Sequence, residues 1–167
     1  MQDVIQEIQM RTKTAKDGFT LIELLIVIVI VAILAMSIFV ALNPIQRLKD
    51  ARDARRRTDV DTLLTAILQY VDDNKGTFPT LLRTGMTETQ IGTGATGCNF
   101  SNSFCTITPT ACIDLTTSLA KYLKSIPKDP STSSAQQTQY TVVIDTNNII
   151  TIKACGTEGT TLIQESR

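Results

Sequence analysis

The hydrophobic residues are concentrated in one block near the N-terminus. Between residues 24 and 42, only Ser37 interrupts a run of aliphatic residues that also contains Met36 and Phe39. At about 1.5 Å per residue, residues 19–42 would form a helix roughly 36 Å long, enough to cross the hydrocarbon core of a bilayer. A secretory signal has a shorter apolar stretch, and so small a protein cannot surround a helix that is apolar on every side. We therefore predict a membrane-spanning helix.

A second helical pattern follows Pro44, which lacks a backbone N–H and is expected to bend the helix or interrupt it locally. Farther along, apolar residues recur at intervals of three and four, as they do on a helix that packs one face on an apolar surface. They are Val60, Leu63, Leu64, Ile67, Leu68 and Val71. Gly76 is the expected C-terminal cap, with Pro79 just beyond it.

The C-terminal part is predicted to form β-structure. Residues 140–144 and 149–154 are rich in Val, Ile and Thr, and turn-forming residues at 145–148 separate them, which predicts an antiparallel hairpin. The other expected elements are weaker strands at 105–108 and 111–113, a loop at 84–104, and a short helix over 115–123 capped by Asp114. Together the patterns predict an α+β fold, a lollipop-shaped subunit in which the second half of a long N-terminal helix packs on a small antiparallel β-sheet.

Glu23 is the one charged residue inside the apolar block, and a polar leader at residues 1–18 precedes the block. A carboxylate inside a membrane helix is costly when it is unpaired, so such a group is presumed functional. The alternative is that Glu23 lies at interface depth and only favours the positive N-terminal end of the helix. The physics of the sequence leaves both interpretations open.

The sequence GFTLIE at residues 18–23, followed at once by the apolar run, resembles the processing motif of type IV prepilins and type II secretion pseudopilins. The resemblance implies that the prepilin peptidase and methyltransferase cuts between Gly18 and Phe19 and N-methylates the new Phe19 amine. It also implies that the helix packs in a filament core and that Glu23 sets assembly. Asp17 departs from the family pattern, because many family leaders carry a basic residue there.

Pattern and resemblance together predict four segments. They are a prepilin leader peptide (1–18), a transmembrane and filament-core helix (19–42), an amphipathic continuation of the helix (43–76) and a β-rich globular head outside the cytoplasm (77–167). The expected partners are identical or related pilin-like subunits, the prepilin peptidase, the inner-membrane assembly machinery and, before assembly, membrane lipid. Nucleic acid is not an expected partner.

The resemblance leaves two filament roles open, a subunit of a type IV pilus-like filament and a pseudopilin of a secretion piston. An uncleaved, membrane-anchored extracellular binding module is a third interpretation, from a different class. It would need neither Glu23 nor the sharp boundary at Gly18.

The expected location is a single membrane pass with the C-terminal domain outside the cytoplasm, in an extracellular or periplasmic filament after assembly. Charge counting alone argues otherwise, because the leader has three basic residues and the stretch from Arg47 to Arg57 has six. We set this count aside because large domains translocate largely regardless of charge, and because the cysteines suit an oxidising compartment.

All four cysteines lie downstream of the apolar block, and an even number in an exported domain favours two disulfides. They are Cys98, Cys105, Cys112 and Cys155. Four cysteines allow three pairings, and the sequence does not choose among them. We favour Cys98–Cys105, which would pin a glycine-rich loop, and Cys112–Cys155, which would tie the C-terminal strand to the body. Without histidine or a CxxC pair, the set argues against zinc.

The charge pattern argues against nucleic-acid binding and against catalysis. The 16 basic and 16 acidic residues cancel, so no global field attracts nucleic acid, and no histidine is present as a general base. A basic cluster on the second helix is interleaved with acidic residues and lacks aromatic neighbours, which predicts a solvated helix face. Its residues are Arg52, Arg55, Arg56 and Arg57, with Asp53–Arg57 and Arg55–Asp59 as expected pairs. No nucleophile motif is recognisable, so we expect no enzyme.

Two further ligand hypotheses come from loop residues. Asp129 and Asp145 are candidate calcium ligands, because some major pseudopilins bind calcium in this region, but turn capping is favoured and no cofactor is expected. Residues 92–97 have the glycine spacing of a dinucleotide-binding loop. We reject that function because no strand is expected before the loop and no helix after it.

Overall fold

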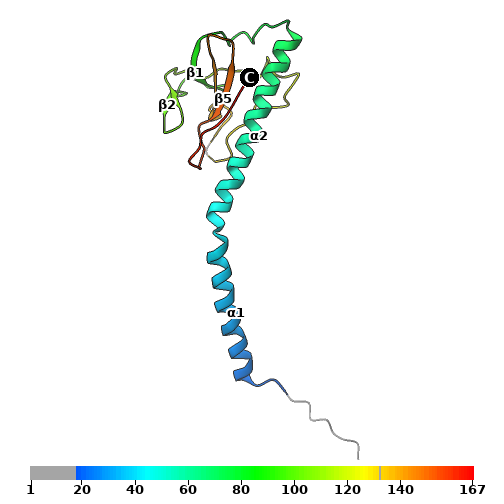
Figure 1. Ribbon diagram of the computed structural model, residues 1–167, viewed down its shortest axis with the longest axis vertical. Coiled ribbons are helices and arrows are strands. Elements are labelled where there is room, and N and C mark those ends of the chain that lie inside the picture. Colours follow the sequence, from blue (N-terminus) through cyan, green and yellow to red (C-terminus); the bar gives the residue numbers. More distant parts are fainter. Residues whose placement is uncertain (1–17, 132) are drawn as a thin grey trace, which may run out of the picture. The chain divides into compact units, whose positions relative to one another are not determined.

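The computed structural model describes residues 18–131 and 133–167. The chain divides into two compact units, residues 1–43 and 44–167, and each is described by itself. The first contains helix α1 (Leu21–Leu42) and the second contains helix α2 (Pro44–Asp73) and the strands (Figure 1). The predicted α+β class is confirmed.

Helix α1 begins after Thr20 and ends at Leu42, where Asn43 adopts a left-handed conformation with φ 39°. None of its residues is buried within the chain. Its 22 residues span about 33 Å at the usual helical rise. By length and composition alone, the helical stretch that starts at Leu21 is apolar enough to cross a membrane.

Helix α2 begins at Pro44, the first helical position, where a missing N–H costs nothing. Pro44 therefore marks an interruption, as predicted. After Asp73 the chain leaves the helix through Lys75 and Gly76, both with positive φ. Lys75 N–H donates to the carbonyl of Asp72 at 3.2 Å and Gly76 N–H to that of Val71 at 2.8 Å, the two bonds of a Schellman cap. Gly76 thus shares the predicted capping role with Lys75.

A four-stranded antiparallel sheet forms the centre of the second unit, in the order β1-β4-β5-β6. Its strands are β1 (Met86–Gln90), β4 (Tyr140–Ile144), β5 (Ile150–Ala154) and β6 (Ile163–Ser166). The predicted hairpin is confirmed, with Tyr140 opposite Ala154 and Ile144 opposite Ile150. The carboxylate of Asp145 organises the turn, because it accepts hydrogen bonds from the N–H groups of Asn147 and Ile149.

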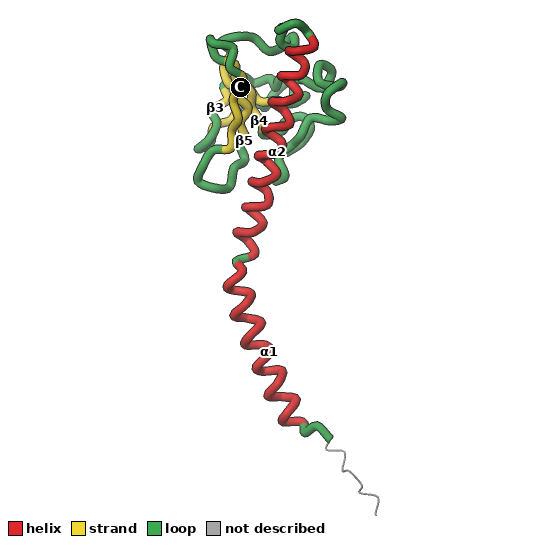
Figure 2. Tube along the Cα trace, turned by 45° about the vertical axis from the view of Figure 1, so that its right-hand side comes forward, coloured by secondary structure: helices red, strands yellow, loops and turns green. Residues whose placement is uncertain are grey.

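The core of this unit lies between α2 and the sheet (Figure 2). Val60, Leu63, Leu64 and Ile67 of α2 are fully buried, as their spacing predicts. They pack with alternate residues of the two central strands, including Val142 and Ile152. A two-stranded hairpin, β2 (Phe100–Ser101) and β3 (Thr106–Ile107), lies on the other side of the sheet from α2 (Figure 1).

Several predicted elements are wrong. The loop expected at 84–104 contains β1 and β2, and β6 was not predicted at all. Strand β1 has the sequence MTETQ, which lacks an alternation of apolar and polar residues, and even the polar Gln90 is fully buried. The segment is a strand because it pairs with β4. Residues 111–113 contribute only one bridge, between Ile113 and Ile91.

The helix expected after Asp114 is a series of turns. Asp114 does cap it, because its carboxylate accepts the N–H of Thr116 at 2.9 Å. Two helix-like backbone bonds, Leu119 to Leu115 and Leu123 to Leu119, hold the turns in place. The apolar spacing does mark buried positions, since Leu119 is fully buried, but the segment forms turns instead of a regular helix.

Candidate functional site

The junction at Gly18 is an exposed, extended segment that leads into a capped helix. Phe19 is 81% exposed. The hydroxyl oxygen of Thr20 accepts a hydrogen bond from the N–H of Glu23 at 3.3 Å, so Thr20 and Glu23 have the spacing of a capping box. Glu23 stands in the first turn, where the helix dipole favours a carboxylate. Residues 1–17 of the expected leader lie outside the described residues.

Glu23 is the only ionisable residue of α1. The other polar side chain, Ser37, donates its hydroxyl to the carbonyl of Leu34 at 2.9 Å and so needs no external partner. The rest of the helix surface is apolar, and large side chains such as Ile28 and Phe39 are 57% and 67% exposed. A helix whose polar groups are satisfied internally suits an apolar surrounding. Glu23 alone is left without such a partner in the part of the chain that the structure describes.

The predicted solvated basic face of α2 is wrong at its centre. Arg56 is fully buried and its guanidinium binds Asp129 bidentately, with Nε–Oδ2 at 2.6 Å and Nη2–Oδ1 at 2.9 Å. Its Nη1 donates to Asp53 Oδ1 at 2.7 Å. Asp53 also accepts the N–H groups of Glu158 and Gly159 at 3.1 and 2.9 Å. These contacts tie α2 to two loops that are distant in the sequence.

The neighbouring basic residues divide into paired and exposed ones. Arg52 binds Glu158 bidentately, with both hydrogen bonds at 2.9 Å. Arg55 is mostly exposed and lies 3.8 Å from Asp59, which confirms that predicted pair. The other predicted pair is wrong, because Asp53 binds Arg56 instead of Arg57. Helical spacing reveals partners on the same helix and cannot reveal carboxylates supplied by loops.

The electrostatics of the buried cluster agree with its geometry. Burial alone would raise the pKa of Asp129, but hydrogen bonds from Arg56 and Ser131 outweigh it and hold this pKa below its usual range. Burial opposes ionisation of Asp53 in the same way, and the N–H groups of Glu158 and Gly159 together with Arg56 lower its pKa. Both carboxylates, and the Arg56 guanidinium that binds them, are therefore charged at neutral pH.

Neither calcium candidate has a free carboxylate. Both oxygens of Asp129 bind Arg56, and one also accepts the Ser131 N–H. Both oxygens of Asp145 accept hydrogen bonds inside its own turn. The geometry therefore favours the capping role for Asp145 and an ion-pair role for Asp129.

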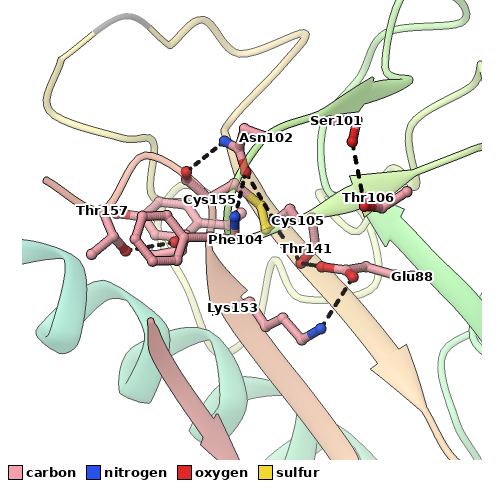
Figure 3. The surroundings of a disulfide bond; sticks show 12 residues. Glu88, Ser101, Asn102, Phe104, Cys105, Thr106, Thr141, Lys153, Cys155 and Thr157 are labelled. Atoms are coloured by element: carbon pink, nitrogen blue, oxygen red, sulfur yellow. Dashed lines mark hydrogen bonds and ion pairs between the residues drawn. A yellow bond between two sulfur atoms is a disulfide. The ribbon is translucent and has the colours of Figure 1, made fainter. Parts of the chain in front are cut away.

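One other cluster brings three potential metal ligands within 4.8 Å of one another, namely Glu88, Cys105 and Cys155. The two sulfurs are bonded to each other and offer no thiolate. Glu88 accepts from Thr141 at 2.7 Å and pairs with Lys153 at 3.1 Å (Figure 3). The cluster is a cross-link beside an ion pair and does not fit a metal site.

All four cysteines form disulfides, but the favoured pairing is wrong. The bonds are Cys98–Cys112 and Cys105–Cys155, with Cα–Cα distances of 5.3 and 5.5 Å. The β2–β3 hairpin decides this pairing. Cys98 precedes the hairpin and Cys112 follows it, so the two cysteines meet at its base. Cys105 lies at its turn and reaches the residue after β5. Asn102 secures this contact by donating to the carbonyl of Cys155 at 2.9 Å (Figure 3).

The glycine-rich loop at 92–97 does follow a strand, β1, so one reason for rejecting a dinucleotide site was wrong. The other reason holds, because turns and a short strand follow the loop instead of a helix. Its glycines have a packing role. A Cβ on Gly92 would lie 2.2 Å from the carbonyl oxygen of Gln136, and one on Gly94 would lie 2.9 Å from it.

Comparison with known protein families finds a match over the N-terminal part of the chain. Residues 13–39 match the family described as the prokaryotic N-terminal methylation motif. The match covers the junction at Gly18, Glu23 and most of α1. No curated protein and no solved structure matches the chain.

Proposed function

We propose that this chain, which carries the prepilin-type motif of type IV pilins and pseudopilins in residues 13–39, is the precursor of a structural filament subunit. It is cut between Gly18 and Phe19, and the new Phe19 amine is N-methylated. The observation that carries the proposal is the coincidence of this motif with a helix that buries none of its residues against the part of the chain that the structure describes.

The apolar surface of α1 explains why the subunit needs two successive environments. Side chains around the whole helix are exposed, including Leu25, Val29 and Ile33. In water this surface would be strongly unfavourable, at about 25 cal/mol for each Å² of apolar area. The bilayer covers it before assembly, and the corresponding helices of neighbouring subunits cover it in the filament.

Glu23 sets the register of assembly. Cleavage creates a positive amine at Phe19, four residues and about one helical turn away. At the membrane interface both groups stay hydrated, but in a packed filament core an unpaired carboxylate is costly. Pairing with the Phe19 amine of a neighbouring subunit removes this cost only at one axial stagger. A buried charge that fixes register is the best-attested use of such groups.

The amphipathic continuation of the helix (43–76) and the β-rich head (77–167) then lie outside the cytoplasm. The two disulfides favour an oxidising compartment. Protease added to spheroplasts should digest this head, and its protection would contradict the orientation.

The decisive experiment is intact-mass analysis of the native, membrane-extracted protein. The expected mass corresponds to loss of residues 1–18 plus one methyl group. Replacing Gly18 with a bulky residue should block cleavage and leave the uncut precursor in the membrane. An uncut wild-type chain would instead support a membrane-anchored binding module.

A further inference from the structure

The head contains a three-residue acceptor motif that neither filament assembly nor the disulfides use. Asn99, Phe100 and Ser101 form the pattern Asn-X-Ser, in which X is not proline. Asparagine in this pattern is the acceptor of N-linked glycosylation in exported proteins. The chain has six asparagines, and Asn99 alone has Ser or Thr two residues later. Because so short a pattern also arises by chance, its use depends on whether the folded head presents the amide.

The three residues of the motif alternate between the surface and the interior of the hairpin. Asn99 and Ser101 are exposed, whereas Phe100 is partly buried and packs against the disulfide between Cys105 and Cys155. Asn99 directly precedes β2, and successive side chains of a strand point to opposite faces. The acceptor amide and the hydroxyl two residues later therefore share the outer face, and Phe100 anchors the motif from the inner one.

The side-chain amide of Asn99 makes no hydrogen bond within residues 18–131 and 133–167. Other asparagines use theirs to hold turns and loops in place, namely Asn74, Asn102, Asn147 and Asn148. The contrast is sharpest with Asn102, three residues away, which joins the hairpin to the end of β5. A group attached to the nitrogen of Asn99 would break no contact of the fold, whereas one attached to Asn102 would break this link.

The position of the motif in the head suits a bulky hydrophilic group. The hairpin lies on the side of the four-stranded sheet away from α2 (Figure 1). Within the described part of the chain, β2 pairs with β3 and with no other strand, so one edge of β2 is open. An open strand edge is a template for pairing with another chain. A glycan beside this edge would shield it, because glycans are bulky and solubilising.

We propose that Asn99 is a site of N-linked glycosylation, an inference that rests on the proposed location of the head outside the cytoplasm. The co-substrate is a sugar or oligosaccharide joined through its anomeric carbon to the phosphate of a lipid carrier. The amide nitrogen of Asn99 forms a bond to this carbon, and the bond between the carbon and the phosphate oxygen breaks. The phosphate leaves with the electron pair, and the nitrogen gives one proton to a base of the transferase.

Mass spectrometry of the native, membrane-extracted protein tests the proposal. The intact mass should exceed that of the cleaved and methylated chain by a sum of sugar residues, and fragmentation of the reduced tryptic peptide 84–121 should place the sugars on Asn99. Asn99→Gln should lose the added mass completely. Because the amide holds no contact, this variant should keep both disulfides in non-reducing peptide mapping. A wild type without added mass, or an added mass that survives in Asn99→Gln, would overturn the proposal.

Variants at the third position separate the motif from the mere presence of Asn99. Ser101→Ala should abolish the modification, and Ser101→Thr should retain it, because either hydroxyl residue completes the motif. The Ser101 hydroxyl lies 3.4 Å from that of Thr106 on β3 (Figure 3), a contact that Ser101→Ala removes. Rescue by Ser101→Thr therefore also shows that the hairpin tolerates a change at this position.

Ser103→Ala is the matched control, since Ser103 is an exposed serine of the same hairpin outside the motif. It should be modified like the wild type. Modification that persists in Ser101→Ala, or is lost equally in Ser103→Ala, would contradict the assignment to Asn99.

The same spectra separate this inference from the proposed function. A chain that is cut after Gly18 and methylated but has an unmodified Asn99 would overturn the glycosylation alone. Sugars on Asn99 of an uncut chain would support the glycosylation and contradict the proposed cleavage.

Discussion

Helix α1 has no buried residue, whereas α2 buries a complete stripe of side chains, although the two helices are separated by Asn43 alone. In α2 several charged residues, Arg52 among them, find partners inside the chain, and Arg56 is fully buried among carboxylates. In α1 the single charge, Glu23, has none among the described residues. Folding of the chain therefore buries one face of α2 and leaves the apolar surface of α1 exposed.

The comparison also separates two roles for a charged side chain. The Arg56 cluster joins α2 to loops more than 70 residues away, since its contacts to Asp129 span 73 positions. Glu23, if the proposed function holds, joins one subunit to the next. The first charge acts on the stability of the head and the second on assembly, so variants at the two sites should separate these properties.

The largest expected effect is on assembly. Glu23→Ala should leave cleavage at Gly18 and membrane insertion intact while filaments become scarce or absent, and Glu23→Gln should be similarly poor because it lacks the charge. Electron microscopy of sheared filaments measures the yield, and intact mass checks processing. Thr20→Ala is the matched control, because it removes the helix cap, worth about 1 kcal/mol, and keeps the charge. Normal filaments from Glu23→Ala, or equal loss from Thr20→Ala, would mean that Glu23 only favours the helix end.

The second effect is on the stability of the head. Arg56→Met should lower the free energy of unfolding by about 3–5 kcal/mol, because it leaves Asp129 and Asp53 buried without their cation. Chemical unfolding followed by near-UV circular dichroism measures the loss. Arg55→Ala, at the adjacent exposed position, should cause no measurable change. Equal effects of the two variants would show that the buried cluster has no special role.

The pH dependence should separate wild type from Arg56→Met. In the wild type the pKa of Asp129 is lowered, so its contribution to stability is present above the unfolded pKa of about 3.9 and is lost as pH falls through the folded value. In the variant burial dominates and raises the pKa of Asp129, so stability falls as pH rises from about 4 to 7. The difference between the two proteins should therefore shrink on acidification, and a constant difference would contradict the assigned charges.

Disulfide removal should give a graded effect. Cys105→Ser/Cys155→Ser opens a closure of 50 residues and Cys98→Ser/Cys112→Ser one of 14. Chain entropy predicts losses of about 4 and about 3 kcal/mol in the free energy of unfolding. Non-reducing peptide mapping checks the pairing first. A peptide joining Cys98 to Cys105 would contradict the structure.

The smallest effect is expected at Tyr140, whose hydroxyl donates to Asp59 of α2 at 2.8 Å. Tyr140→Phe keeps the buried ring and removes one hydrogen bond between α2 and β4. The expected loss is about 1 kcal/mol in the same unfolding experiment. A loss as large as that of Arg56→Met would mean that this bond belongs to the same cooperative cluster.

Elements with a strong local signal were predictable. The β4–β5 hairpin, the interruption at Pro44 and the buried stripe of α2 were all anticipated within a residue or two. Strands β1 and β6 were not, because MTETQ and IQES lack a hydrophobic alternation and become strands through pairing with β4 and β5. In these two segments the conformation is set by hydrogen bonding to a neighbouring strand and not by the local sequence.

The sequence by itself determined what depends on neighbouring residues: the apolar helix, the motif at the Gly18 junction and the presence of cysteines in an even number. Tertiary structure alone decided which distant groups meet. It placed Arg56 against Asp129 and joined Cys105 to Cys155. The physical reason is that such contacts depend on where loops return to the helix and sheet, and neither residue spacing nor composition encodes that return.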